Sequence, residues 1–268
     1  MTLLTAGTER PEIAYTRKGS GPNFLLLHGG MGSRNHWARN VDALAAHFTV
    51  YAVDHPGYGE SPDVDKAMSG DEYRALMCRA VDTMLPDGAS FHIAGFSFGS
   101  VLGSCIAARF GRRATALSIV GSSGYGRPEG REVATRSYKS AGDDDVKFRE
   151  IVRNNLLAFM LTNPESIDDT AIDYHGANVR RTRFDSRKVS WGDTQRLDLP
   201  RTTCPLQVIW GTKDITAHPT LESRIKLVKS FKPDLRLDIV EGGSHWTMYD
   251  SAEEVNRLLL DFHLGVEG

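Results

Sequence analysis

The sequence has few cysteines, no excess of charge of either sign and no long apolar run. Its three cysteines are far apart in the chain and form no Cys-x-x-Cys pair: Cys78, Cys105 and Cys204. We therefore expect neither a disulfide framework nor a structural zinc site, and a reducing, cytoplasmic compartment is the expected location. No stretch approaches the roughly 20 apolar residues that a membrane-spanning helix requires, so no membrane partner is expected.

The balance of charges argues against a nucleic-acid partner. The 268 residues include 32 Lys and Arg against 34 Asp and Glu, a formal net charge of −2. A protein that binds a phosphate backbone normally carries a basic excess, so no nucleic acid is expected to bind. A chain of this length can bury a sizeable core as one α/β domain, and its sequence leaves a homo-oligomer open.

Short β-rich runs alternate with longer helical ones along most of the chain. The expected strands are residues 12–16, 24–28, 48–54, 90–95, 116–120, 206–211 and 235–240. The expected helices are residues 36–46, 71–85, 98–110, 221–229 and 252–263. The last helix opens with a capping-box pattern from Ser251 to Glu254. Because several strands are continuous apolar runs, this order predicts an α/β protein with a mostly parallel central sheet.

Residues 127–199 break this alternation. No convincing strand occurs there, charges of both signs become denser, and residues 146–161 fit a helix. We interpret the region as a helical subdomain inserted into an α/β core made of residues 1–126 and 200–268. Pro205 then leads the chain back into the sheet.

Ser97 is the centre of a Gly95-Phe-Ser-Phe-Gly99 motif between an expected strand and an expected helix. A serine on so sharp a turn is held clear of the backbone, and the flanking glycines remove Cβ atoms that would clash. The following helix presents its positive end and free N–H groups to a developing oxyanion. The motif predicts a nucleophilic serine, and the alternative is an ordinary turn with a solvent-facing serine.

The segment His28-Gly-Gly-Met-Gly32 directly follows another expected strand. Small residues there let backbone N–H groups converge on a bound oxygen, which would supply the other half of an oxyanion hole. The alternative is a flexible Gly-rich turn. We expect His28 itself to orient the loop through hydrogen bonds rather than to act as a catalyst.

Two more candidates follow the late strands: Asp214 after Trp210-Gly-Thr-Lys, and His245 after Gly242-Gly-Ser. A serine nucleophile needs a base to take its proton, and the base needs a carboxylate to fix its tautomer. In a parallel sheet all three residues would lie beyond the carboxyl ends of strands. Each taken alone is an ordinary turn or loop residue, but the order Ser, Asp, His matches this type of site.

Motifs for other chemistries are missing. No Gly-x-Gly-x-x-Gly follows a strand, no phosphate-binding Gly-x-x-x-x-Gly-Lys-Ser/Thr occurs, and no His-Glu-x-x-His or comparable metal spacing is present. We therefore expect no cofactor and no metal.

Together with Asp54-His-Pro-Gly-Tyr-Gly-Glu-Ser61, these motifs resemble the α/β-hydrolase superfamily over residues 12–263. The resemblance implies a mostly parallel, eight-stranded sheet flanked by helices, a helical cap inserted after the sixth strand, and no cofactor. By the same resemblance Ser97 is the nucleophile, His245 the general base and acid, and Asp214 the orienting carboxylate.

The resemblance also implies an oxyanion hole formed by the backbone N–H groups of Gly30 and Phe98, with Met31 competing for the place of Gly30. The function that it implies is that of a serine hydrolase, which acts through an acyl-enzyme on a small carboxylic ester or related carbonyl substrate. Two alternatives stay open: a carbon–carbon bond hydrolase, and a non-catalytic ligand receptor on the same fold.

The pair His245-Trp246 and the arginine-rich residues 179–184 resemble the carbon–carbon bond hydrolases that cleave meta-cleavage ring-fission products. In that group a cap arginine and the tryptophan contact an acidic dienone, which implies substrate contacts here from Met31, Arg183 and Trp246. The other reading of this stretch, which includes Arg180 and Arg181, is a solvated helical face. The sequence departs from that group by having Phe98 in place of methionine, Ser244 in place of glycine, and no proline in the oxyanion loop.

Overall fold

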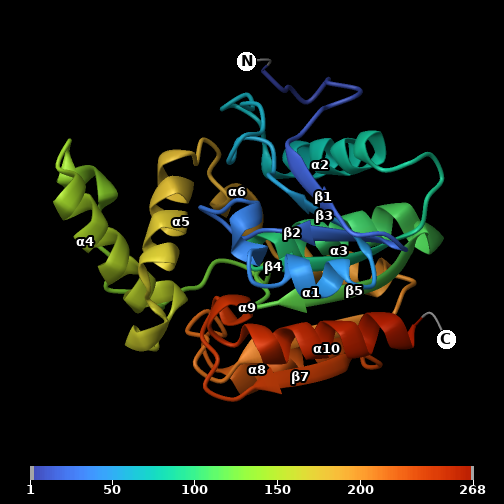
Figure 1. Ribbon diagram of the computed structural model, residues 1–268. Coiled ribbons are helices and arrows are strands. Elements are labelled where there is room, and N and C mark those ends of the chain that lie inside the picture. Colours follow the sequence, from blue (N-terminus) through green and yellow to red (C-terminus); the bar gives the residue numbers. More distant parts are fainter. Residues whose placement is uncertain (1–2, 267–268) are drawn as a thin grey trace.

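A seven-stranded sheet forms the centre of the protein in a computed structural model that describes residues 3–266 (Figure 1). The strands are β1 (Tyr15–Lys18), β2 (Asn23–Leu27), β3 (Thr49–Val53), β4 (Phe91–Phe96), β5 (Ala114–Val120), β6 (Leu206–Gly211) and β7 (Arg236–Val240). Their order across the sheet is β1-β3-β2-β4-β5-β6-β7. All neighbours pair in parallel except β1, which is antiparallel to β3.

Helices cover both faces of the sheet because alternate side chains of each strand enter separate apolar clusters. In β2, Leu25 and Leu27 belong to one cluster, whereas Phe24 and Leu26 belong to the other. The first cluster includes side chains of α2 (Gly70–Met84), α3 (Phe98–Phe110) and α8 (Leu221–Phe231). The second includes side chains of α1 (Val41–Ala45), α9 (Thr247–Asp250) and α10 (Ala252–Gly265).

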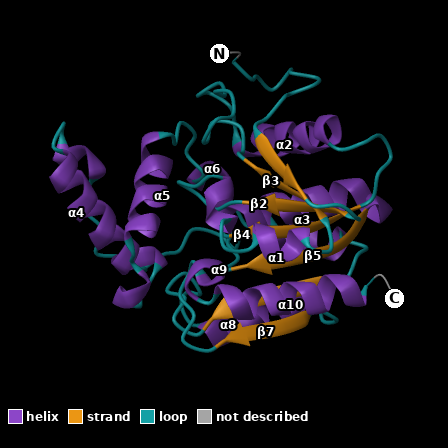
Figure 2. Ribbon diagram, viewed as in Figure 1, coloured by secondary structure: helices purple, strands orange, loops and turns teal. Residues whose placement is uncertain are grey.

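The segment between β5 and β6 contains helical elements and no strand among its residues, all of which are described. Its elements are η3 (Tyr138–Ala141), α4 (Asp145–Asn155), the π-helix η4 (Leu156–Met160), η5 (Pro164–Ser166), α5 (Asp169–Arg180), α6 (Arg187–Ser190), α7 (Gln195–Asp198) and η6 (Leu199–Arg201). We call residues 121–205 the helical insertion. Figure 2 shows the arrowheads of β5 and β7 pointing toward the side where α4 and α5 stand. The insertion therefore lies beyond the carboxyl ends of the strands, whereas the narrower limits 127 and 199 stay a prediction.

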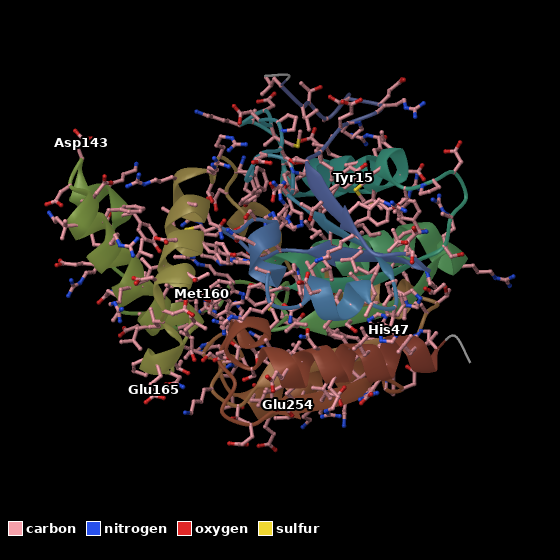
Figure 3. The ribbon with its side chains drawn as sticks, in the orientation of Figure 1. Tyr15, His47, Asp143, Met160, Glu165 and Glu254 are labelled. Atoms are coloured by element: carbon pink, nitrogen blue, oxygen red, sulfur yellow. The ribbon has the colours of Figure 1, made fainter. Side chains whose placement is uncertain are left out.

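The insertion is attached to the core next to the last strand. Met160, labelled in Figure 3, lies where the two parts meet, and its carbonyl accepts a hydrogen bond from the backbone of Trp246 at 2.9 Å. The backbone N–H of Thr162 donates to Ser244 Oγ, also at 2.9 Å. Asp143 and Glu165, also labelled in Figure 3, lie on the outer margin of the insertion.

The sheet has seven strands among residues 3–266, so the expected eighth strand is wrong for the described chain, and the insertion follows the fifth strand rather than the sixth. The cause lies in the segment before β1. There Leu4 makes one isolated bridge to Val64, and the residues from Thr5 to Glu12 are mostly polar and include Gly7 and Pro11. Such a segment has little apolar surface to bury and no continuous donor row for a ladder.

Two expected helical features also differ. The predicted helix 36–46 is divided into a 3₁₀ turn, η1 (Arg34–Trp37), and the short α1. The capping box predicted at Ser251 is absent, because α9 runs directly into this residue and the Ser251 hydroxyl donates to Asp250 instead. A capping box does form at the start of α2, between Ser69 and Glu72. Within residues 3–266, no helix combines the length and the apolar composition needed to cross a bilayer.

Candidate active site

Ser97 occupies the turn between β4 and α3 with a φ of +51°, a region that side chains other than glycine rarely adopt. Its backbone N–H donates to the carbonyl of Val120 at 2.9 Å. A Cβ atom on Gly95 would lie 2.3 Å from the carbonyl oxygen of Gly99, and one on Gly99 would lie 2.4 Å from that of Leu27. Both glycines of the sequence motif are therefore required by the close packing of this turn.

His245 lies between Ser97 and Asp214 in a continuous chain of hydrogen-bonding contacts. Its Nε2 is 3.1 Å from Ser97 Oγ, and its Nδ1 is 3.0 Å from Asp214 Oδ2. Asp214 follows β6 and His245 follows β7, and at most 1% of either side chain is exposed. The three residues singled out in the sequence thus meet at the carboxyl ends of three parallel strands.

Thr216 holds the carboxylate of Asp214 and was not recognised in the sequence. Its backbone N–H and its hydroxyl donate to Asp214 Oδ1 at 2.8 and 2.7 Å. Burial opposes the ionisation of Asp214, but attraction to His245 and these hydrogen bonds outweigh it and lower the pKa of the carboxyl group. An ionised Asp214 favours the His245 tautomer with a proton on Nδ1, which leaves Nε2 free to accept a proton from Ser97.

Gly121, directly after β5, is a second residue that sequence reasoning missed. It has a φ of +52°, and a Cβ atom there would lie 3.0 Å from His245 Nδ1 and 3.1 Å from Asp214 Oδ2. Only a glycine at this position lets the imidazole and the carboxylate approach each other without crowding. The signal in the sequence is a glycine that ends a buried strand beside the one that carries the Gly-x-Ser-x-Gly turn.

The loop after β2 also borders Ser97. Gly30, Met31 and Phe98 all line the cavity above the serine. Met31 has a φ of +45°, and Phe98 is the first residue of α3, so its N–H has no partner within the helix. A Cβ atom on Gly30 would come within 2.6 Å of Ser186 Oγ. The residues expected at the oxyanion hole are thus placed around one end of the cavity.

Buried histidines hold this loop from behind. The backbone N–H of His55 donates to His28 Nε2 at 3.0 Å, so the proton of His28 is on Nδ1, which donates to the carbonyl of Gly29 at 2.7 Å. The Gly29 N–H donates to His36 Nδ1 at 3.2 Å, and the rings of His28 and His55 stack with centroids 3.7 Å apart. His28 therefore orients the loop, as expected, and burial lowers its pKa to about 4 although Asp54 acts in the opposite direction.

The cavity above Ser97 has a volume of about 230 Å³. Core elements supply one wall and the helical insertion supplies the other, with Phe159 and Trp191 among its lining side chains. Three arginines also line it: Arg131, Arg187 and Arg224. Arg187 is neutralised by Asp185, whose carboxylate lies 2.7 Å from its guanidinium.

Arg131 and Arg224 have no carboxylate within ion-pair distance in the described part of the chain. The Arg131 guanidinium lies 5.4 Å from the ring centroid of Phe159, and that of Arg224 lies 5.1 Å from the ring centroid of Tyr125. The Nε of Arg224 is buried and has no hydrogen-bond acceptor. Burial lowers the pKa of both groups, so two unneutralised, partly desolvated cations face the cavity.

Arg183 and Trp246, the other two expected substrate contacts, do not line this cavity. Arg183 donates to the carboxylate of Asp63 and to the carbonyl of Ser61 at 2.6 Å, which fastens the insertion to the loop after β3. Trp246 is fully buried and donates from Nε1 to the carbonyl of His36 at 2.9 Å. The sequence could not distinguish these structural uses of an arginine and a tryptophan from substrate contacts.

The neighbouring arginines are surface residues. Arg180 pairs with Asp145 at 2.6 Å, and Arg181 lies 3.7 Å from Glu60. Their side chains are each 57% exposed, which agrees with the reading of a solvated helical face. Within residues 3–266, no three His, Cys, Asp or Glu side chains form a group that could hold a metal ion.

Comparison with known proteins decides the family. The family model described as "Alpha/beta hydrolase family" matches residues 24–258, which is most of the chain. The chain belongs to the alpha/beta hydrolase family. Its parallel sheet, with helices on both faces, is the fold of that family, and the chain is an α/β-fold hydrolase.

Three relatives illustrate the range of this hydrolase's similarity. It is 28% identical over 282 residues to a 2-hydroxy-6-oxononadienedioate/2-hydroxy-6-oxononatrienedioate hydrolase of Paraburkholderia phymatum, covering 98% of this chain and 94% of the relative. It is 27% identical over 254 residues to the dihydrolipoyllysine-residue acetyltransferase component of an acetoin cleaving system of Pseudomonas putida, covering 90% of this chain but only 63% of that protein. The crystal structure of an esterase from a Rhodococcus species superposes with a TM-score of 0.72 at 21% identity, covering 92% and 93% of the two chains.

We predict that Gly121→Ala lowers kcat/KM of the hydrolase by about 10- to 100-fold, because the new methyl group displaces the His245 ring. Both the new methyl and the positive φ will cost stability, the latter about 1 kcal/mol. Gly126→Ala is the matched control, since Gly126 also has a positive φ but nothing lies within 4 Å of its Cβ position. Esterase assays and urea unfolding of both variants test this, and equal losses of activity would contradict it.

We also predict that the protein loses stability as the pH falls from about 6.5 to about 4. Burial lowers the pKa of His28 and of His175 to about 4, so the unfolded chain, with a histidine pKa near 6.5, binds these protons first. Each histidine then contributes a slope of up to about 1.4 kcal/mol per pH unit. Urea unfolding between pH 7 and pH 4.5 measures it. His175→Gln should flatten the profile and the exposed His47→Gln should not; a flat wild-type profile would refute the assignment.

Proposed function

We propose that this hydrolase is a serine hydrolase that cleaves a small carboxylic ester or a related carbonyl substrate through an acyl-enzyme intermediate. The observation that carries the proposal is the hydrogen-bonded chain from Ser97 Oγ through His245 to Asp214, which opens into a cavity. A serine held at a positive φ, with a buried base and an ionised carboxylate behind it, is the arrangement that acyl transfer needs.

In the first step Ser97 Oγ attacks the substrate carbonyl while His245 Nε2 takes the serine proton. Asp214 keeps the imidazole in the required tautomer and stabilises the imidazolium that forms. The backbone N–H groups of Phe98 and Gly30 stabilise the tetrahedral oxyanion, with Met31 as the competitor for the second position. The imidazolium then protonates the leaving group, and water releases the acyl group from Ser97 by the same steps in reverse order.

The size and charge of the cavity restrict the substrate. A volume of about 230 Å³ admits a small acyl or leaving group, and aromatic side chains supply an apolar surface. The uncompensated Arg131 and Arg224 favour a substrate with a carboxylate on the part that lies away from Ser97. Discrimination by these arginines takes over the role that the sequence assigned to Arg183.

The same arginines favour one alternative, a carbon–carbon bond hydrolase of meta-cleavage ring-fission products. The name of the Paraburkholderia relative describes a dienedioate substrate, which is an acidic carbonyl compound, and its similarity covers almost the whole chain. Hydrolysis beside a ketone would use Ser97, His245 and the oxyanion hole in the same positions. The other alternative, a ligand receptor without turnover, has no observation of its own in its favour.

We predict that a fluorophosphonate labels Ser97 and no other serine, and that Ser97→Ala lowers kcat by at least about 10⁴-fold with unfolding free energy unchanged within about 0.5 kcal/mol. Ser123→Ala is the control, because Ser123 lines the same cavity and its hydroxyl has no partner. Mass spectrometry locates the label, and stopped-flow hydrolysis of a 4-nitrophenyl ester measures turnover. Label on Ser123, or acylation of Ser97 without steady-state turnover, would contradict the hydrolase proposal, the second in favour of the receptor.

We predict that Arg131→Gln and Arg224→Gln each lower kcat/KM about 10- to 100-fold for a mono-4-nitrophenyl ester of glutaric acid, but less than about threefold for 4-nitrophenyl butyrate. The difference is the loss of a charge-assisted hydrogen bond, worth about 1.5–3 kcal/mol. Arg180→Gln, at the exposed ion pair, should affect neither ester. Equal effects on both esters would show that the arginines do not recognise an anionic group, and the neutral-ester reading would then stand.

A further inference from the structure

Two cysteines that are 27 positions apart in the sequence meet between α2 and α3, which pack side by side (Figure 1). Cys78 lies in the middle of α2 and Cys105 in the middle of α3, and their sulfur atoms are 3.9 Å apart. Both are free thiols in the structure. This separation is twice the length of a disulfide bond, so a change of side-chain rotamers would bring the sulfurs into bonding contact.

The pair is reached from the surface through a second cavity on the opposite side of α3 from no part of the Ser97 site, since the two cavities share no lining residue. This second cavity has a volume of about 770 Å³, and both cysteines line it. Five arginines line it as well: Arg74, Arg79, Arg109, Arg113 and Arg201. The carboxylates among its lining residues are Asp71, Asp82 and Asp198. A small neutral oxidant can therefore reach two thiols in surroundings with an excess of positive charge.

The two thiols have different roles because their surroundings differ. The hydrogen bond from the Cys78 thiol, followed by attraction to the Arg74 guanidinium, lowers the pKa of Cys105, while burial acts in the opposite direction. The same hydrogen bond and burial raise the pKa of Cys78. Cys105 is therefore the thiolate that reacts first, and Cys78 is placed to react with its product.

We propose that Cys78 and Cys105 form a peroxide-reactive dithiol that closes to a reversible disulfide. The Cys105 thiolate attacks one oxygen of hydrogen peroxide, the O–O bond breaks, and the departing hydroxide takes up a proton to give water and a sulfenic acid on Cys105. The Cys78 sulfur then attacks the Cys105 sulfur, and its proton leaves with the hydroxyl group as a second water. Two thiols and one peroxide thus give one disulfide and two waters, and an added dithiol reverses the bond.

Cys204 provides an internal comparison. It is buried, it lies in neither of these two cavities, and burial raises its pKa to about 11. Its thiol has no neighbouring cysteine within contact distance in the described chain. Peroxide at neutral pH should therefore leave Cys204 reduced while the other two cysteines are consumed.

The test treats the folded, full-length protein with one equivalent of hydrogen peroxide at pH 7, then alkylates the remaining thiols in denaturant and digests with trypsin. We expect the peptide of residues 75–79 disulfide-linked to the peptide of residues 80–109, and Cys204 fully alkylated. Dithiothreitol should restore both thiols. Cys105 should be lost at least about tenfold faster than Cys204, because the thiolate is the reactive form.

Variants separate the two steps. Cys78→Ala should stop at the sulfenic acid, which dimedone traps on Cys105, whereas Cys204→Ser should leave the yield of disulfide unchanged. Wild-type protein alone decides the matter if a helix variant fails to fold. Oxidation of Cys105 to sulfinic acid beside a free Cys78, or consumption of Cys204 at the same rate as Cys105, would overturn the proposal.

Discussion

The close contact between the Ser97 turn and the strands on either side of it is the constraint on which the site depends. The turn is possible because Gly95 and Gly99 let the backbone of α3 pack directly against that of β2 and β4. The hydrogen bond from Ser97 to Val120 then fixes the turn against β5. Since β5 also ends in Gly121, the same strand places the serine and leaves room for the histidine that serves it. Backbone packing, rather than side-chain pairing, thus sets the geometry of the reacting groups.

Most of the core was predictable because it depends on local patterns that the sequence states directly. Continuous apolar runs predicted six strands close to their observed positions, and the glycine-flanked serine marked the turn between a strand and a helix. The order Ser97, Asp214, His245 placed three residues that lie far apart in the chain at one edge of the sheet. The missing eighth strand could not be predicted in this way, because the resemblance supplied that count and the polar segment before β1 did not.

The wall of the cavity was predicted poorly, and for a physical reason. An arginine can neutralise a surface carboxylate, hold a loop carbonyl or face a ligand, and its neighbours in the sequence do not decide among these uses. Arg183 was expected at the substrate but holds a loop, whereas Arg131 lies in an irregular segment that carries no motif. Thr216 and Gly121 were likewise missed, because their importance comes from contacts between different strands.

The attachment of the helical insertion at two separate places has a consequence for how molecules enter and leave the cavity. One attachment joins Met160 and Thr162 to the loop after β7, and the other joins Arg183 to the loop after β3. A body held at both margins cannot swing away from the sheet as a hinged lid without breaking one of them. Exchange of substrate and product then requires only small movements of side chains at the rim, such as the half-exposed Met31. The rate of such exchange would respond to the bulk of residue 31 more than to solvent viscosity.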